Sequence, residues 1–184
     1  MKPNPTVDLT LKTARVITTL KCTKNCSYCS NKMDHIKKQM KQLSNIDDLL
    51  NYDLICLTGG EPLLVFERIS KLITGLRNVK PEILIYMYSS IWTENFRYLL
   101  PYLDGVHYTL HDYQPFNDNA NHFYKSQFLF YDNPNKSYRL SLSPNITAPL
   151  PLIPNVWKEV RIKKWFSEKE NIVPVHEDLF ILNN

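Results

Sequence analysis

The chain lacks the features that would place it in a membrane or outside the cell. None of its stretches approaches the roughly 18 consecutive apolar residues that a membrane-spanning helix requires. Its first residues, MKPNPTVDLTLKTAR, contain no apolar segment of the kind found in signal peptides. We therefore expect a cytoplasmic protein with no membrane partner, in a compartment where thiols stay reduced and available for metal.

Repeats and low-complexity tracts are also absent, and glycine is scarce, with 4 residues in a chain of 184. The composition, 43% hydrophobic and 22% charged, is that of an ordinary globular protein. This length most simply forms one domain, with a core at about 14–165 and a C-terminal extension at about 166–184. The formal charge of +4 is a mild bias that does not indicate nucleic-acid binding.

Apolar runs rich in β-branched residues alternate with segments of helical spacing. The predicted strands are 14–19, 54–58, 83–89, 105–110, 138–142 and 157–162. The predicted helices are 44–50, 66–76 and 93–100. This alternation is typical of βαβ units and a parallel sheet.

Chain length limits how large that sheet can be. At about thirty residues per unit the chain accommodates about six units, whereas a complete eight-unit barrel takes about 250 residues. Residues 144–154 contain four prolines and cannot form a regular helix, so the fifth crossover is expected to be extended. We therefore expect an α/β fold, an open partial parallel (β/α)6-type barrel with a degenerate C-terminal half.

Three of the four cysteines lie within eight residues, directly after the first predicted strand. They are Cys22, Cys26 and Cys29. Three thiolates can bind three irons of a 4Fe-4S cluster, which is usually held by four Cys. The missing ligand would leave one iron open for chemistry. Neighbouring lysines at 21, 24 and 32 would favour the ionised thiolates.

Zinc is the alternative metal, with Cys56 or His35 as its fourth ligand. Structural zinc sites favour two separated Cys pairs, and this chain has one triplet and no second pair. Cys56 lies inside an apolar run, where a free Cys is usually a small core residue. Tyr28 precedes the last ligand of the triplet, where its ring could pack on a cluster, on a bound planar group or simply against its neighbours.

A second motif, Thr58-Gly59-Gly60-Glu61-Pro62, ends the second predicted strand. It contains half of the chain's glycines. Glycine allows close approach of the backbone to a ligand or a positive φ, and Pro62 favours the start of a helical turn. A strand-to-helix turn alone would explain a single Gly-Gly pair, but here the pair follows the cysteine triplet by one βα unit.

The C-x3-C-x2-C triplet after the first strand and GGEP after the second resemble the radical S-adenosylmethionine superfamily over at least residues 14–110. The resemblance implies that Cys22, Cys26 and Cys29 bind a 4Fe-4S cluster whose open iron binds S-adenosyl-L-methionine. Backbone carbonyls at 59–61 would accept hydrogen bonds from its amino group. In such enzymes the cluster reductively cleaves this cofactor, and the 5′-deoxyadenosyl radical that forms abstracts a substrate hydrogen.

The resemblance extends less completely to other positions. It implies that Thr109 and Ser89, near the ends of the fourth and third predicted strands, contact the cofactor. The polar stretch 111–122 follows the fourth strand and is a candidate substrate loop. Three histidines in the C-terminal half are candidate acid–base or substrate-binding groups, and each is equally consistent with a surface role. They are His111, His122 and His176.

Two clusters of basic residues, at 32–41 and 161–164, do not identify a binding partner by themselves. They are consistent with solvated surfaces, with an anionic substrate or with an acidic, flavodoxin-like electron donor. The expected substrate is a small molecule derived from a nucleotide or an amino acid. One alternative is an activase that installs a glycyl radical on a partner protein. Another is a metal-stabilised binding module without turnover.

Overall fold

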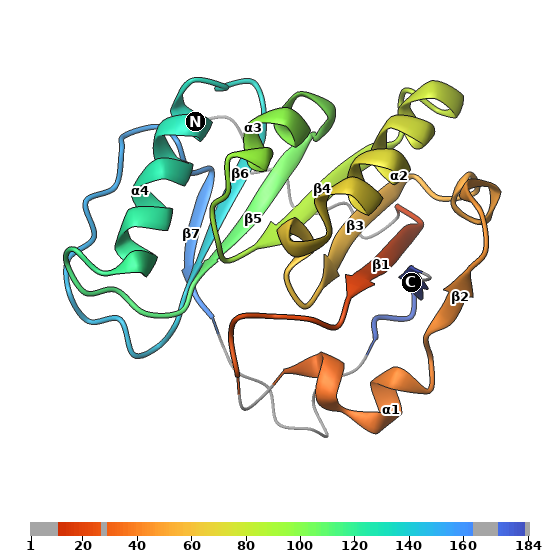
Figure 1. Ribbon diagram of the computed structural model, residues 1–184, viewed down its shortest axis with the longest axis horizontal. Helices are drawn as coiled ribbons and strands as arrows, with labels where there is room; N and C mark the ends of the chain where they lie inside the picture. The colour runs from red at the N-terminus through yellow and green to blue at the C-terminus, as the bar shows by residue number, and fades with distance from the viewer. Residues whose placement is uncertain (1–10, 27–28, 164–172, 183–184) are drawn as a thin grey trace.

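The computed structural model describes residues 11–26, 29–163 and 173–182. Within them, eight strands form one open, all-parallel sheet in the order β2-β8-β1-β3-β4-β5-β6-β7 (Figure 1). The strands are β1 (Thr13–Thr19), β2 (Lys41–Leu43), β3 (Leu54–Gly59), β4 (Leu84–Ser89), β5 (Gly105–Leu110), β6 (Ser137–Leu142), β7 (Glu159–Ile162) and β8 (Glu177–Leu182). The sheet and its interleaved helices make this an α/β fold.

Four α-helices and four short 3₁₀ helices connect the described strands. The α-helices are α1 (Asp34–Lys37), α2 (Phe66–Val79), α3 (Asn95–Leu99) and α4 (Asp118–Tyr131). The 3₁₀ helices are η1 (Ser30–Lys32), η2 (Ile46–Leu49), η3 (Pro62–Val65) and η4 (Leu100–Tyr102). Figure 1 shows α2, α3 and α4 along one face of the sheet, with α1 beyond the end of β1.

The six predicted strands are confirmed as β1, β3, β4, β5, β6 and β7, which are neighbours in chain order. Two strands were not predicted. β2 has three residues, and β8 lies near the end of the chain and pairs with β1 in parallel. Such long-range pairing leaves no local signal in the sequence.

Two predictions of local structure were wrong. The helix expected at 44–50 is the 3₁₀ turn η2, capped by the Asn45 side chain and closed by Asp48 in a capping box. The expected loop 111–122 is a loop only up to Asn117, whose side chain caps α4 at the amide of Ala120. The extended segment at 144–154 is confirmed.

The main core lies between the sheet and α2, α3 and α4. Alternate residues of the central strands face these helices, including Val16, Ile55, Leu57, Met87 and Tyr108, all of which are buried. Helix α2 contributes its own apolar stripe, consisting of Ile69, Leu72, Ile73 and Leu76. This face supplies most of the apolar burial that stabilises the fold.

The opposite sheet face, here called the polar face, carries ionisable and hydroxyl side chains. Register pairs place them together: Arg15 beside Cys56, His107 beside Arg139, and Ser141 beside Arg161. At one end, α1 covers this face, where Met33 and Ile36 pack on Ile17 and Leu179. The sheet therefore separates an apolar, helix-covered side from a charged side.

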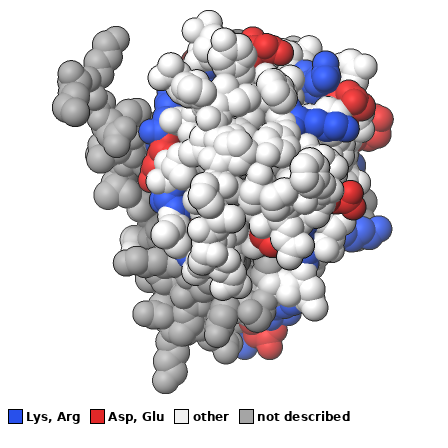
Figure 2. All heavy atoms as spheres, turned by 90° about the vertical axis from the view of Figure 1, so that its left-hand side faces the viewer, with Lys and Arg blue, Asp and Glu red and all other residues white. Residues whose placement is uncertain are grey.

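Helix α4 and the segment 143–158 form a surface with few charges. Figure 2 shows that this side of the molecule is largely uncharged, with charged side chains toward its margins. Phe128 and Tyr131 of α4 are more than half exposed there. No helix in the described part of the chain is both long enough and apolar enough to cross a bilayer.

An ion pair on the polar face joins β8 to β1. The Arg15 guanidinium donates from Nε to Glu177 Oε2 at 2.8 Å and from Nη2 to Oε1 at 2.9 Å. Both side chains are largely buried, with exposed fractions of 26% and 11%. Burial lowers the pKa of Arg15, but the nearby Tyr88, Glu177 and Cys56 more than reverse this, so the net pKa is raised.

We predict that Arg15→Gln lowers the free energy of unfolding by about 3 kcal/mol, because it leaves the Glu177 carboxylate buried without its partner. Urea unfolding checks this value. The control is Arg97→Gln, which removes an exposed pair with Glu94 and should change stability by no more than about 0.5 kcal/mol. Equal losses in the two variants would contradict the role given to the β1–β8 pair.

Candidate functional site

The cysteine loop, residues 20–29, follows the carboxyl end of β1. Its turns are held by backbone and lysine contacts: the Lys24 amide donates to Cys22 Sγ at 3.3 Å, and the Lys32 ammonium donates to Cys26 O at 3.1 Å. The Lys32 amide closes the loop by donating to Cys29 O at 2.9 Å, which begins η1. Short-range contacts therefore shape the loop that carries the three thiols.

All three loop cysteines are free thiols, with Cys22 exposed and Cys26 and Cys29 half-buried. Burial raises the pKa of Cys26 above its ordinary value, and the neighbouring thiols act in the same direction. Lys163 and Lys32 oppose this rise. Of the three lysines expected to favour the thiolates, Lys32 acts in that direction on Cys26, and burial outweighs its effect.

Residues from distant strands surround this loop. His111, directly after β5, has its Nδ1 atom 3.6 Å from Cys26 Sγ. Lys24 donates to Asn119 Oδ1 in the first turn of α4 at 2.5 Å. Lys163, directly after β7, interacts electrostatically with Cys26 and Cys29. The carboxyl ends of β1, β5 and β7 thus contribute to one region of the molecule.

The Gly-Gly-Glu turn after β3 packs directly on the beginning of the cysteine loop. The Gly60 amide donates to Thr19 O at 2.7 Å, and the Glu61 amide donates to Lys21 O at 2.9 Å. Gly59 has a φ of +114°, which L residues with a side chain rarely adopt. A Cβ on Gly60 would lie 2.0 Å from Lys21 O. The two glycines are therefore needed for contact between the two backbones.

The Glu61 side chain points into the protein and organises the end of β4. Its buried carboxylate accepts hydrogen bonds from Ser89 Oγ at 2.7 Å, from the Ser90 amide at 2.9 Å and from Ser90 Oγ at 3.0 Å. Burial raises the pKa of Glu61, while these hydrogen bonds lower it in part. The Glu61 backbone carbonyl accepts from the Leu64 amide at 3.0 Å at the start of η3. Pro62 is buried at the first position of η3.

The structure separates two residues that the resemblance had linked to the cofactor. Ser89 lies on the helix-covered side of β4, next to Glu61, whereas Thr109 lies half-buried on the polar side of β5, in register with Ser141. Thr109 is two residues before His111 and faces the same side of the sheet. Because His111 contacts Cys26, Thr109 is directed to the side of the sheet that carries the cysteine loop. Tyr28 lies outside the described residues.

One of the three candidate histidines contacts the cysteine loop. Burial, with Lys163 and Lys24 nearby, lowers the pKa of His111 to about 4, so the imidazole is neutral at pH 7. His122 lies within α4, and His176 precedes β8, where its carbonyl accepts from the Thr13 amide at 3.3 Å. Sequence reasoning did not distinguish His111 from the other two, although its position directly after a parallel strand was a usable signal.

Sequence reasoning also missed the buried histidine of the polar face. Burial and four surrounding cations lower the pKa of His107 to about 3. Cys56, the candidate fourth zinc ligand, is buried beside Arg15, and burial raises its pKa to about 11. Cys56 belongs to the strand interior rather than to the cysteine loop.

The first basic cluster is largely paired within the protein. Lys37 lies 3.2 Å from Asp34, Lys41 lies 2.5 Å from Asp178, and Lys32 donates to Asn25 Oδ1 at 2.6 Å. In the second cluster, Arg161 and Lys163 belong to the polar face, and residue 164 is outside the described part. The lysines of the first cluster are therefore largely paired with acidic or amide side chains, whereas the described residues of the second lie on the polar face of the sheet.

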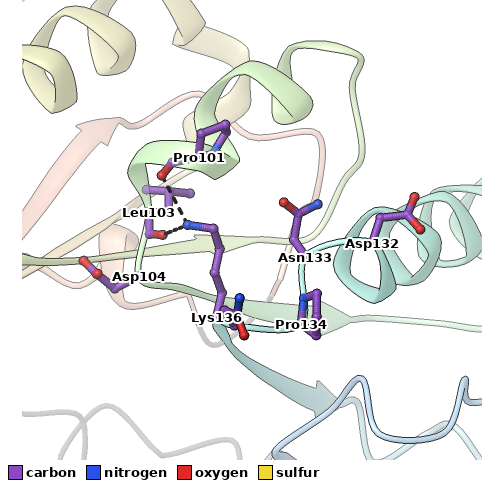
Figure 3. A pocket seen from close by; sticks show the side chains of 8 residues that line it. Pro101, Leu103, Asp104, Asp132, Asn133, Pro134 and Lys136 are labelled. Atoms are coloured by element: carbon purple, nitrogen blue, oxygen red, sulfur yellow. Dashed lines mark hydrogen bonds between the residues drawn. The ribbon is translucent and has the colours of Figure 1, made fainter.

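A hollow of about 410 Å³ lies at the opposite ends of the strands (Figure 3). Its lining consists of Pro101, Leu103, Asp104, Asp132, Asn133, Pro134, Asn135 and Lys136. The Lys136 ammonium donates to Pro101 O at 3.2 Å and to Leu103 O at 2.5 Å. These hydrogen bonds connect the segment that leads into β5 with the segment that leads into β6. The lysine that lines the hollow therefore has a structural role.

Among residues 11–26, 29–163 and 173–182, no three His, Cys, Asp or Glu side chains converge closely enough to hold a metal ion. No protein-family model matches the chain, and no curated protein matches it.

We predict that Gly60→Ala destabilises the protein by about 1–3 kcal/mol, because the added methyl group meets the Lys21 carbonyl and pushes the cysteine loop away. Thermal and urea unfolding measure the loss. The control is Gly75→Ala in α2, whose methyl group meets only the end of the Ile46 side chain. A Gly60→Ala variant as stable as the parent protein would contradict this packing role.

Proposed function

We propose that this protein is a radical S-adenosylmethionine enzyme. The observation that carries the proposal is the direct hydrogen bonding between the Gly-Gly-Glu turn and the first residues of the cysteine loop. The two motifs that define the resemblance are separated in sequence by two β-strands, two 3₁₀ turns and a helix, yet hydrogen bonds join the backbone of one to the chain leading into the other. A turn that served only to begin η3 would not need this contact.

The chemistry of the donor atoms fits an iron–sulfur cluster. Thiolates are soft ligands suited to such clusters, and Cys22, Cys26 and Cys29 are free and lie on a loop rather than in the packed core. Lys32 and Lys163 offset part of their negative charge. Cys56 is buried in β3 beside Arg15, so it does not complete a fourth position. This donor set supports a cluster with one open iron more than a four-ligand zinc site.

The remaining residues support defined roles around that cluster. When bound and reduced, a 4Fe-4S cluster of this kind cleaves S-adenosyl-L-methionine and so generates the radical that removes a substrate hydrogen. The backbone of residues 59–61 would hold the amino group of that cofactor, and Thr109 would hold its ribose or carboxylate. His111 would hydrogen-bond to a ligand sulfur, a contact of the kind that tunes cluster potentials.

The strand order also supports the finer fold that we propose. An open (β/α)6-type barrel would consist of β1 and β3 to β7, with β8 and β2 added beside β1. Residues 111–117, which contact the cysteine loop through His111, would cover a small nucleotide- or amino-acid-derived substrate. An acidic, flavodoxin-like protein remains the proposed electron donor.

Anaerobic reconstitution with iron and sulfide should give a brown protein. We predict that Cys22→Ala, Cys26→Ala and Cys29→Ala each lower iron affinity by more than about tenfold. Cys56→Ala is the matched control and should keep its iron, because Cys56 is buried in β3 and away from the loop. Iron analysis and visible absorbance measure the result. Recovery of one zinc per chain, with no iron uptake, would contradict the cluster.

With a chemical reductant, the reconstituted protein should release 5′-deoxyadenosine from S-adenosyl-L-methionine even without substrate. Chromatography of the quenched reaction measures this product, and the Cys26→Ala variant serves as the blank. A fully loaded cluster that never yields the product would exclude the proposed catalysis and favour a binding module. Release that requires a partner protein would favour an activase.

A further inference from the structure

Lys24 connects the cysteine loop to helix α4. It lies between Cys22 and Cys26, and its amide donates to Cys22 Sγ at 3.3 Å. Its ammonium donates to Asn119 Oδ1 at 2.5 Å, across 95 positions of the chain. Lys24 and Asn119 are both half-buried, so the local dielectric is lower than at the open surface and the hydrogen bond between them is stronger. A side chain of α4 therefore holds the residue whose backbone contacts a thiol of the triplet.

Asn119 also holds the candidate substrate loop, residues 111–117. Its Nδ2 atom donates to Asp112 Oδ1 at 2.6 Å, and the same oxygen accepts from Asn117 Nδ2 at 3.1 Å. The Asn117 side chain in turn accepts from the Ala120 amide at 2.8 Å and so caps α4. The Asp112 carboxylate therefore connects both ends of this loop with the first turn of α4.

The chemistry of the three side chains fixes the direction of these hydrogen bonds. An ammonium group can only donate and an ionised carboxylate can only accept, whereas an amide does both. Asn119 lies between the Lys24 cation and the Asp112 anion, so its oxygen faces Lys24 and its nitrogen faces Asp112. A carboxylate in place of the amide would repel Asp112, and a methyl group would leave both partners without this contact.

Other contacts of the substrate loop differ in what they join. His111 Nδ1 lies 3.6 Å from Cys26 Sγ, at the cysteine loop. The hydroxyl groups of Tyr113 and Tyr124 lie 2.7 Å apart and join the substrate loop to α4. Loss of the tyrosine pair should therefore loosen the substrate loop by a route that does not pass through Lys24, which makes this pair a matched comparison for Asn119.

We infer that Asn119 is a positioning residue that couples the cysteine loop to the candidate substrate loop. By holding Lys24 it directs the Lys24 amide to Cys22 Sγ, and hydrogen bonds to ligand sulfurs are among the factors that set the potential of a cluster. By holding Asp112 it keeps residues 111–117 beside the same thiols. The inference rests on the proposed function in one respect, namely that the three thiols bind a cluster. The hydrogen bonds exist without a cluster, so the two ideas can fail separately.

The first test follows amide hydrogen exchange by NMR in the metal-free, full-length chain. Asn119→Ala should speed exchange about fivefold both at residues 22–26 and at residues 111–117, which corresponds to loss of about one hydrogen bond. Tyr124→Phe should speed exchange at residues 111–117 alone. Unchanged exchange at residues 22–26 in Asn119→Ala, or the same pattern in both variants, would overturn the inference.

An exchange of the two side chains separates this chain of hydrogen bonds from general loosening. Asn119→Asp keeps an oxygen for Lys24 but places a second carboxylate against Asp112, so it should speed exchange at residues 111–117 and leave residues 22–26 protected. Adding Asp112→Asn supplies an amide donor to the new carboxylate and should return exchange at residues 111–117 to the parent rate. A double variant that exchanges as fast as Asn119→Asp would contradict the coupling through these groups.

The second test measures the reduction potential of the protein reconstituted with iron and sulfide. Asn119→Ala should load as much iron as the parent protein, but at a lower reduction potential, because Cys22 Sγ loses a donor that stabilises the more negative, reduced cluster. Tyr124→Phe should leave the potential unchanged. An Asn119→Ala cluster with the parent potential would overturn the inference. If the parent chain forms no cluster while exchange in the variants follows the expected pattern, the proposed function fails and the coupling between the loops stands.

Discussion

The parallel pairing of β1 with β3 is the constraint on which the candidate site depends. Because the two strands run in the same direction, the loops after Thr19 and Gly59 leave the sheet at the same edge. The amides of Gly60 and Glu61 then donate to the carbonyls of Thr19 and Lys21, and a Cβ on Gly60 would lie 2.0 Å from the Lys21 oxygen. The backbone of the turn after β3 thus fixes the position of the beginning of the cysteine loop.

The two faces of the sheet differ in what they contribute: one buries most of the apolar core, and the other carries the ionisable side chains. The side covered by α2, α3 and α4 buries most of the apolar residues, and that burial offsets the cost of holding ionisable groups in the sheet on the other side. Arg15, His107 and Ser141 are accommodated there because each has a partner within hydrogen-bond distance. A parallel sheet presents the loops that follow its strands at one edge, so His111 and Lys163 adjoin the cysteine loop.

Local patterns predicted much of this arrangement, and the errors have identifiable physical causes. Six strands followed from their apolar runs. β8 did not, because its contact with β1 joins Arg15 to a residue 162 positions away. The start of α4 has the polar sequence Asp-Asn-Ala-Asn, which resembles a turn, and its helical form depends on the Asn117 cap. The cofactor contact that the resemblance implies for Ser89 stays a prediction, and alternation along β4 directs this side chain to the helix-covered side.

The sequence by itself determined the α/β class, the set of three thiols available as ligands and the two glycines of the turn, because these depend on residue type and on spacing along a short segment. Only the tertiary structure decided which distant residues adjoin those thiols. His111 follows β5 and Lys163 follows β7, and strand order and register bring both to the side of the sheet that carries the cysteine loop. Register arises from packing across the whole sheet, and no short segment encodes it.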